Sequence, residues 1–182
     1  MRTEDHFFLT TYITRNSGIK TWQRNLFLLG NILPDYNRLT YLGPRSQFFS
    51  HGHSFKAQRR KIERFFRRPY RNTPLWWYRT GKIFHYVTDS FTRPHNPEFC
   101  YNSPSHIAYE LRLQEVFDRE LTGRRWKIPA VTGDPYYWLF RRHAYYMKHS
   151  RDIPEDCEYI CTTIPALWKW VYANKIEPGK RK

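Results

Sequence analysis

Residues 81–96, GKIFHYVTDSFTRPHN, hold three side chains able to bind a metal ion: His85, Asp89 and His95. If residues 73–91 are helical, His85 and Asp89 stand one turn apart on one face, about 6 Å apart along the axis. Pro94 stops such a helix, so His95 can fold back over the same end. The stretch therefore predicts a metal site at the end of a helix.

The helix that carries this stretch is expected to be buried. Thr73 is a good N-cap, and Pro74 suits the first helical position. Apolar side chains then occupy nearly every face, which is typical of a helix inside a core. A histidine and a carboxylate in such a helix are costly unless they are paired or bind a metal. The composition of the helix thus supports the prediction made from its spacing.

The rest of the chain also shows helical spacing, and no alternation of apolar and polar residues predicts a strand. We expect Pro34 to end the second helix, with Asp35 in the turn that follows. Ile153-Pro154 and Ile164-Pro165 are expected to start two short helices near the end. The prediction is an all-α single domain over 1–182, a bundle of six to eight helices around a metal cluster, in which 124–182 adds helices and a basic tail. Helices are expected over residues 5–16, 20–32, 55–68, 73–91, 103–123 and 135–149.

A strongly basic helix follows the segment SHGHS (50–54), which supplies His51 and His53. The formal net charge of the chain is +15, which implies an anionic partner: nucleic acid, an acidic membrane surface or a phosphate-bearing substrate. A run of charge on a helix is usually a solvated face, but like charges at this density repel one another, which favours contact with phosphates. The predicted anion-binding surface consists of Lys56, Arg59, Arg60, Lys61, Arg64, Arg67 and Arg68.

Cysteine usage bears on the compartment. An odd number of cysteines, Cys100, Cys157 and Cys161, is not typical of a disulfide framework, and buried free thiols explain the last two better than a metal site does. The start of the chain has no basic-then-apolar signal pattern, and no apolar run approaches the roughly 20 residues that a membrane span needs. These features predict the cytoplasm, with peripheral contact at the inner face of the membrane as an option.

A second helix repeats the pairing of histidine with an acid: His106 and Glu110 stand at i and i+4. Such pairs are a standard way to present nitrogen and oxygen ligands to one ion. Eight histidines in 182 residues produce one such pair by chance fairly often, and ordinary contacts on a helix surface would explain either pair alone. The pairs by themselves therefore leave both explanations open.

The order of the motifs resembles that of the zinc-dependent phospholipase C family and its related single-strand nucleases. Their order is His6, Pro34-Asp35, His51/His53, His85-x3-Asp89-x5-His95 and His106-x3-Glu110, with GNILPD and HYVTDSFTRPHN as the most recognisable segments. The resemblance covers residues 6–110.

The resemblance implies which side chains would hold the metal ions. Asp35, His53 (or His51), His85 and Asp89 would hold one zinc, and His95, His106 and Glu110 a second with an open position. His6 and Asp89 would hold a third, which in the family is completed by an N-terminal tryptophan. This chain has Met1 there, so either the Met1 amine substitutes, or Glu4 or Asp5 does, or the third zinc is weak or absent.

The implied activity is phosphodiester hydrolysis by a metal-activated water, with Asp35 as general base. Glu110, where the nuclease branch tends to have aspartate, favours a phospholipid substrate over single-stranded nucleic acid. A further alternative is a protein without catalysis, in which structural zinc stabilises a surface that binds nucleic acid or acidic membrane. The ligand set thus implies two or three zinc ions and leaves these three functions to be distinguished.

Overall fold

The computed structural model describes residues 1–36, 53–99 and 102–177. These residues form seven α-helices and contain no strand. The helices are α1 (Thr3–Thr14), α2 (Thr21–Tyr36), α3 (Phe55–Arg67), α4 (Pro74–Asp89), α5 (Ser103–Gly123), α6 (Pro135–His149) and α7 (Ile153–Val171). Short helical turns follow α4 at η3 (Arg93–His95) and η4 (Pro97–Phe99), and α7 continues into η5 (Tyr172–Ile176). The predicted all-α fold is confirmed.

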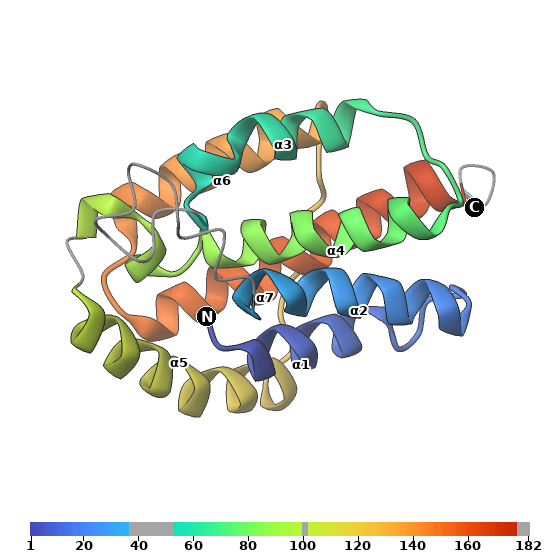
Figure 1. Ribbon diagram of the computed structural model, residues 1–182. Coiled ribbons are helices and arrows are strands. Elements are labelled where there is room, and N and C mark those ends of the chain that lie inside the picture. Colours follow the sequence, from blue (N-terminus) through green and yellow to red (C-terminus); the bar gives the residue numbers. More distant parts are fainter. Residues whose placement is uncertain (37–52, 100–101, 178–182) are drawn as a thin grey trace.

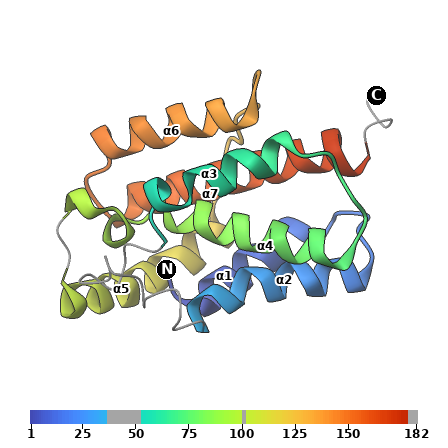
Figure 2. The same cartoon turned by 45° about the horizontal axis from the view of Figure 1, so that its top comes forward.

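Helices α4 and α7 run through the middle of the bundle, with α1, α2 and α5 on one side and α3 and α6 on the other (Figure 1). The second view keeps this order, and α6 lies farthest from α1 and α2 (Figure 2). Aromatic side chains fill the centre: Phe27 of α2 stacks on Trp168 of α7 and meets the edge of Phe84 of α4. The ten buried residues of α4 include both His85 and Asp89, as its composition predicted.

Local signals placed most helix starts correctly. The side chains of Thr73 and Asp134 each accept a backbone hydrogen bond at the start of α4 and α6, with proline next in line. In α5 the cap is Asn102, one residue before the expected Ser103-Pro104 start. Caps of this kind contribute about 1 kcal/mol each.

Two predictions that rested on proline were wrong. Pro34 lies inside α2, which continues to Tyr36, so Asp35 is a helical residue and not part of a turn. Pro165 lies inside α7, which is one helix over Ile153–Val171 and not two short ones. A proline removes one backbone hydrogen bond and crowds the preceding turn. Pro34 lies in the last turn of α2, and Pro165 is buried in α7, where packing against the core offsets the lost hydrogen bond.

Helices α2 and α4 approach each other most closely at two glycines. A Cβ atom added to Gly30 would lie 2.0 Å from the carbonyl oxygen of Tyr78, and one added to Gly81 would lie 2.1 Å from that of Phe27. The two backbones therefore touch where the glycines cross. This crossing sets the position of Asp35, at the end of α2, relative to His85 on α4.

Candidate metal centre

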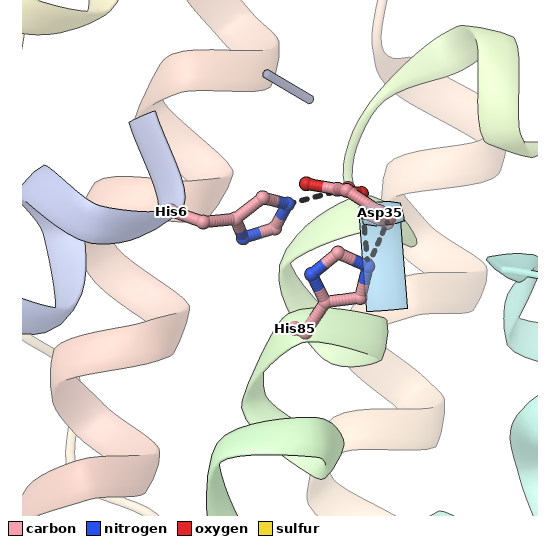
Figure 3. Close-up of side chains that lie close together, drawn as sticks. His6, Asp35 and His85 are labelled. Carbon is pink, nitrogen blue, oxygen red and sulfur yellow. Dashed lines mark hydrogen bonds and ion pairs between the residues drawn. The ribbon is translucent and has the colours of Figure 1, made fainter. Parts of the chain in front are cut away.

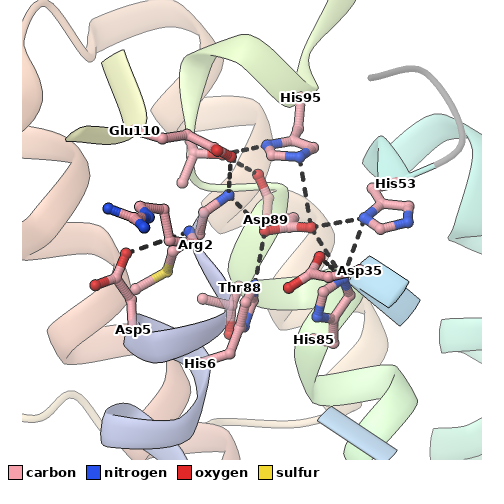
Figure 4. Close-up of polar contacts among 12 residues, drawn as sticks. Arg2, Asp5, His6, Asp35, His53, His85, Thr88, Asp89, His95 and Glu110 are labelled. Carbon is pink, nitrogen blue, oxygen red and sulfur yellow. Dashed lines mark hydrogen bonds and ion pairs between the residues drawn. The ribbon is translucent and has the colours of Figure 1, made fainter. Parts of the chain in front are cut away.

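Asp89, the last residue of α4, is the hub of a buried polar cluster (Figure 4). Its Oδ1 atom lies 3.1 Å from His6 Nε2 and 3.1 Å from the amine of Met1. Its Oδ2 atom lies 2.9 Å from His53 Nδ1 and 3.1 Å from His85 Nε2. Helices α1 and α4, the segment before α3 and the first residue of the chain thus deliver nitrogen atoms to one carboxylate.

A second carboxylate faces the same cluster from α2 (Figure 3). Asp35 Oδ1 lies 3.5 Å from His85 Nε2, and its Oδ2 accepts a hydrogen bond from the hydroxyl of Thr3. The ring of His6 stacks on that of His85 with 4.1 Å between centroids. His6, Asp35, His85 and Asp89 thus form one group whose ligand atoms all lie within 4.8 Å of one another.

The remaining candidate ligands form two further groups. His53 and His95 lie with Asp89 in one, and His95 lies with His106 and Glu110 in the other. On α5 the i,i+4 pair is in contact, with His106 Nε2 3.0 Å from Glu110 Oε1. Because Asp89 and His95 each belong to two groups, the three groups form one continuous centre.

Hydrogen bonds at Nδ1 orient two of the histidines. His85 Nδ1 lies 2.8 Å from the carbonyl oxygen of Asn31, which only accepts, so this nitrogen carries the proton. The Thr92 hydroxyl donates to the carbonyl of Asp89 and therefore accepts from His95 Nδ1 at 2.8 Å. In both neutral rings the Nε2 lone pair is left facing the carboxylates, as in a metal-ligating histidine.

The electrostatics of the centre favour a bound cation. Burial lowers the pKa of His85 to about 4 and that of His95 well below its usual value, so both rings are neutral at pH 7. Burial alone would raise the pKa of Glu110, but the nearby Met1 ammonium and His106 hold it well below its normal value. Neutral imidazole nitrogens and ionised carboxylates at this spacing are the donor set that zinc prefers. His6 adds a buried Nδ1 without a hydrogen-bond partner among the described residues.

The structure brings together the residues that the resemblance implied as ligands, within the described part of the chain. His95, His106 and Glu110 lie together in one group, and His6 lies with Asp35, His85 and Asp89 in another. His53 is grouped with Asp89 and His95, and its Nδ1 atom also lies 3.1 Å from His85 Nε2. His51 lies outside the described residues. Of the groups considered in place of the family's tryptophan, the Met1 amine is the one beside Asp89, whereas Glu4 is exposed and Asp5 accepts from the backbone of Arg2.

The other predicted residues lie apart from the centre. The seven basic residues of the predicted anion-binding surface are exposed on α3 and its end, while Phe55, Ile62 and Phe65 are buried beneath them. Cys157 and Cys161 are buried free thiols, and burial raises the pKa of both. Cys100 lies outside the described residues. None of the described helices is both long and apolar enough to span a bilayer.

Sequence reasoning missed the residues that orient the ligands. Asn31 acts through its backbone carbonyl, so its side chain gave no signal. Thr92 stands three residues from both Asp89 and His95, and it could have been found by asking which neighbour can accept from the histidine. No sequence pattern indicates that the Met1 amine lies beside Asp89.

Thr92→Val is expected to weaken zinc binding at the His95 group about 10- to 100-fold, the usual cost of losing a partner that orients a ligand. Valine keeps the shape of threonine but removes the acceptor for His95 Nδ1. Thr92→Ser keeps the hydroxyl and should bind zinc as the wild type does. Competition with a chromogenic chelator measures the affinity, and equal affinities for the two variants would show that the hydroxyl does not orient the ring.

The fold and the site together define an all-α protein with a candidate metal centre in its core. The model of the zinc dependent phospholipase C family matches residues 5–164, so the chain belongs to this family. The match confirms the resemblance and extends it beyond residue 110, where the sequence offered no motif. It supports zinc as the metal and a phospholipase C-like hydrolase as the class. No curated protein and no solved structure was found to match the chain.

Proposed function

We propose that the protein is a zinc-dependent phosphodiester hydrolase of the phospholipase C type, with its catalytic centre around Asp89. The observation that carries the proposal is the convergence of nine nitrogen and oxygen donors from the N-terminus, α1, α2, α4, α5 and the segments next to α3 and α4. The proposed ligands are the Met1 amine, His6, Asp35, His53, His85, Asp89, His95, His106 and Glu110.

We assign the ligands to two or three ions along the lines of the family resemblance. Asp35, His85 and Asp89, with His53 or His51, form the first set, and His95, His106 and Glu110 form the second. His6 and Asp89 form the third, in which the Met1 ammonium would give up its proton on binding the ion and take the place of the tryptophan. Asp89 would belong to two of these sets, and each of its oxygens faces a histidine nitrogen.

The chain's own residues have separate tasks in the proposed reaction. Zinc, when bound, offsets the charge of the phosphate oxygens and makes hydroxide available near neutral pH. Asp35 is the candidate general base: it is the more exposed of the carboxylates in its group, and the hydroxyl of Thr3 fixes one of its oxygens. Burial raises the pKa of Asp35, which makes it the stronger proton acceptor.

A phospholipid is the favoured substrate, because the second ligand set ends in Glu110. The basic surface of α3 begins directly after His53, since Ser54 caps that helix. An anionic membrane held against α3 would therefore lie next to the candidate centre. Location in the cytoplasm, at the inner face of the membrane, is part of this proposal, and the free thiols of Cys157 and Cys161 suit a reducing compartment.

The proposal predicts that the purified protein, incubated with zinc, releases a phosphorylated head group from phosphatidylcholine. EDTA or His85→Ala should abolish the release, and zinc added back should restore it in the wild type only. Activity that survives His85→Ala would contradict the proposal. Digestion of single-stranded DNA with the lipid left intact would select the nuclease alternative, and tightly bound zinc without turnover would select a non-catalytic binding protein.

A further inference from the structure

A cavity of about 740 Å³ lies between α6 and α7, lined also by Pro129 and Thr132 of the segment before α6. None of the candidate metal ligands lines it. Helix α6 forms the side of the bundle away from α1 and α2 (Figure 2), so this cavity is separate from the metal centre. Its volume is in the range of sites for small molecules.

The two helical walls of the cavity carry opposite charges. On α6, lining residues recur every fourth position, which places them on one face. The α6 wall consists of Tyr137, Trp138, Arg141, Arg142, Tyr145 and His149, and the α7 wall of Glu155, Glu158 and Tyr159.

Arg142 is held in place by uncharged neighbours. Its Nε atom donates to the hydroxyl of Thr163 at 2.6 Å, and one terminal nitrogen donates to Thr162. The guanidinium lies over the rings of Trp138 and Tyr159, at 5.6 and 5.3 Å from their centroids. Five N–H groups are available on a guanidinium, and these two hydrogen bonds leave three for a ligand.

The arginines and glutamates of the two walls are not joined by ion pairs, although Glu158 is close enough to act on the charge of Arg142. Within the described part of the chain, neither Arg141 nor Arg142 forms an ion pair with any carboxylate, and Glu158 forms none with any cation. Glu155 accepts the backbone N–H of Arg151. A ligand that carried both charges could pair with each wall, and a simple anion or cation could pair with only one.

We propose that this cavity binds a zwitterionic phosphate ester of an alkylated ammonium, of the phosphocholine type. The phosphate would receive hydrogen bonds from Arg141 and Arg142, because a guanidinium matches phosphate geometry. The ammonium would lie near Glu158, against the face of the Tyr145 ring opposite the one on which His149 stacks, because an aromatic face attracts cations. The choice of a phosphate ester rests on the proposed function, since this is the head group that the reaction would release.

The test is calorimetric titration of the zinc-loaded protein with phosphocholine, inorganic phosphate and choline. Phosphocholine is expected to bind at two sites, the cavity and the metal centre. Arg142→Gln should weaken the binding of phosphocholine at the cavity at least tenfold. Binding at the metal centre and hydrolysis of a soluble substrate should stay unchanged. Arg112→Gln, an exposed arginine on α5, is the matched control and should change neither site.

Glu158→Gln tests the opposite wall at an exposed position, where folding is not at risk. It should weaken the binding of phosphocholine at the cavity and leave the binding of inorganic phosphate there unchanged. The proposal is overturned if neither variant changes phosphocholine binding, or if phosphate alone binds the site as tightly as phosphocholine does.

Binding at the cavity is measured separately from hydrolysis, so the two proposals can fail separately. A protein that binds phosphocholine at the cavity without hydrolysing lipid contradicts only the proposed function, and one that hydrolyses lipid without binding at the cavity contradicts only this inference. Displacement of phosphocholine from the cavity by phosphatidylcholine vesicles would identify the intact lipid head group as its source. If the vesicles do not displace phosphocholine, the ligand of the cavity is the released product.

Discussion

Asp89→Asn is expected to reduce bound zinc to one ion per chain at most and to lower hydrolysis by more than about 100-fold. Asp89 contributes to two of the three candidate groups, so only His95, His106 and Glu110 remain complete without it. An amide cannot supply the negative charge that the converging histidine nitrogens and the Met1 amine face. The expected loss exceeds the roughly 10- to 100-fold cost of losing a residue that only orients a ligand.

Asp118→Asn is the control for this substitution, because Asp118 is an exposed aspartate on α5 outside the three groups. It should keep the zinc content and the activity of the wild type. Elemental analysis and circular dichroism of both variants separate loss of metal from loss of fold. A folded Asp89→Asn protein with full zinc content would contradict the assignment of Asp89 as the shared ligand.

Gly81→Ala is expected to lower the free energy of unfolding by about 3 kcal/mol, at the upper end of the usual cost of overpacking. The new Cβ would meet the Phe27 carbonyl at 2.1 Å and the Asn31 amide nitrogen at 2.8 Å. Both belong to the backbone of α2, so no side-chain rotation relieves the contact and the helices must separate. Alanine gains about 1 kcal/mol in helix propensity over glycine, which does not offset the clash.

The separation should also weaken zinc binding, because it moves Asp35 and the Asn31 carbonyl away from His85. Urea unfolding with and without zinc measures both effects. Gly123→Ala is the control: its Cβ would meet nothing within 4 Å, so stability should change by less than about 0.5 kcal/mol. Equal midpoints for the two variants would show that α2 and α4 do not touch at Gly81.

Helix periodicity and caps predicted the fold well, because each depends on residues close together in the sequence. Burial of α4 followed from its composition, and Thr73 and Asp134 start their helices as capping chemistry requires. Proline was misleading at Pro34 and Pro165, since its cost is local and packing against other helices can outweigh it. The crossing at Gly30 and Gly81 was not predictable, because it depends on which two helices become partners.

In the candidate site, too, contacts within one helix were predictable and contacts between helices were not. The i,i+4 spacing of His85 and Asp89 fixes their geometry within one helix, so the sequence was enough to predict that pair. Which histidine joins which carboxylate depends on how α1, α2 and α5 dock on α4, which spacing within one segment does not encode, so the assignment of ligands to ions stays a prediction. The approach of Met1 to Asp89, across the length of the chain between them, has no signal in spacing.

Zinc content is the most direct test of the central claim that the cluster around Asp89 is a metal centre. Elemental analysis of the protein, purified without an affinity tag and dialysed after incubation with zinc, is expected to give two or three ions per chain. Three would mean that His6, Asp89 and the Met1 amine hold an ion of their own. A chain that retains no zinc would contradict the account, and the converging histidines would then form a hydrogen-bonded core without a metal.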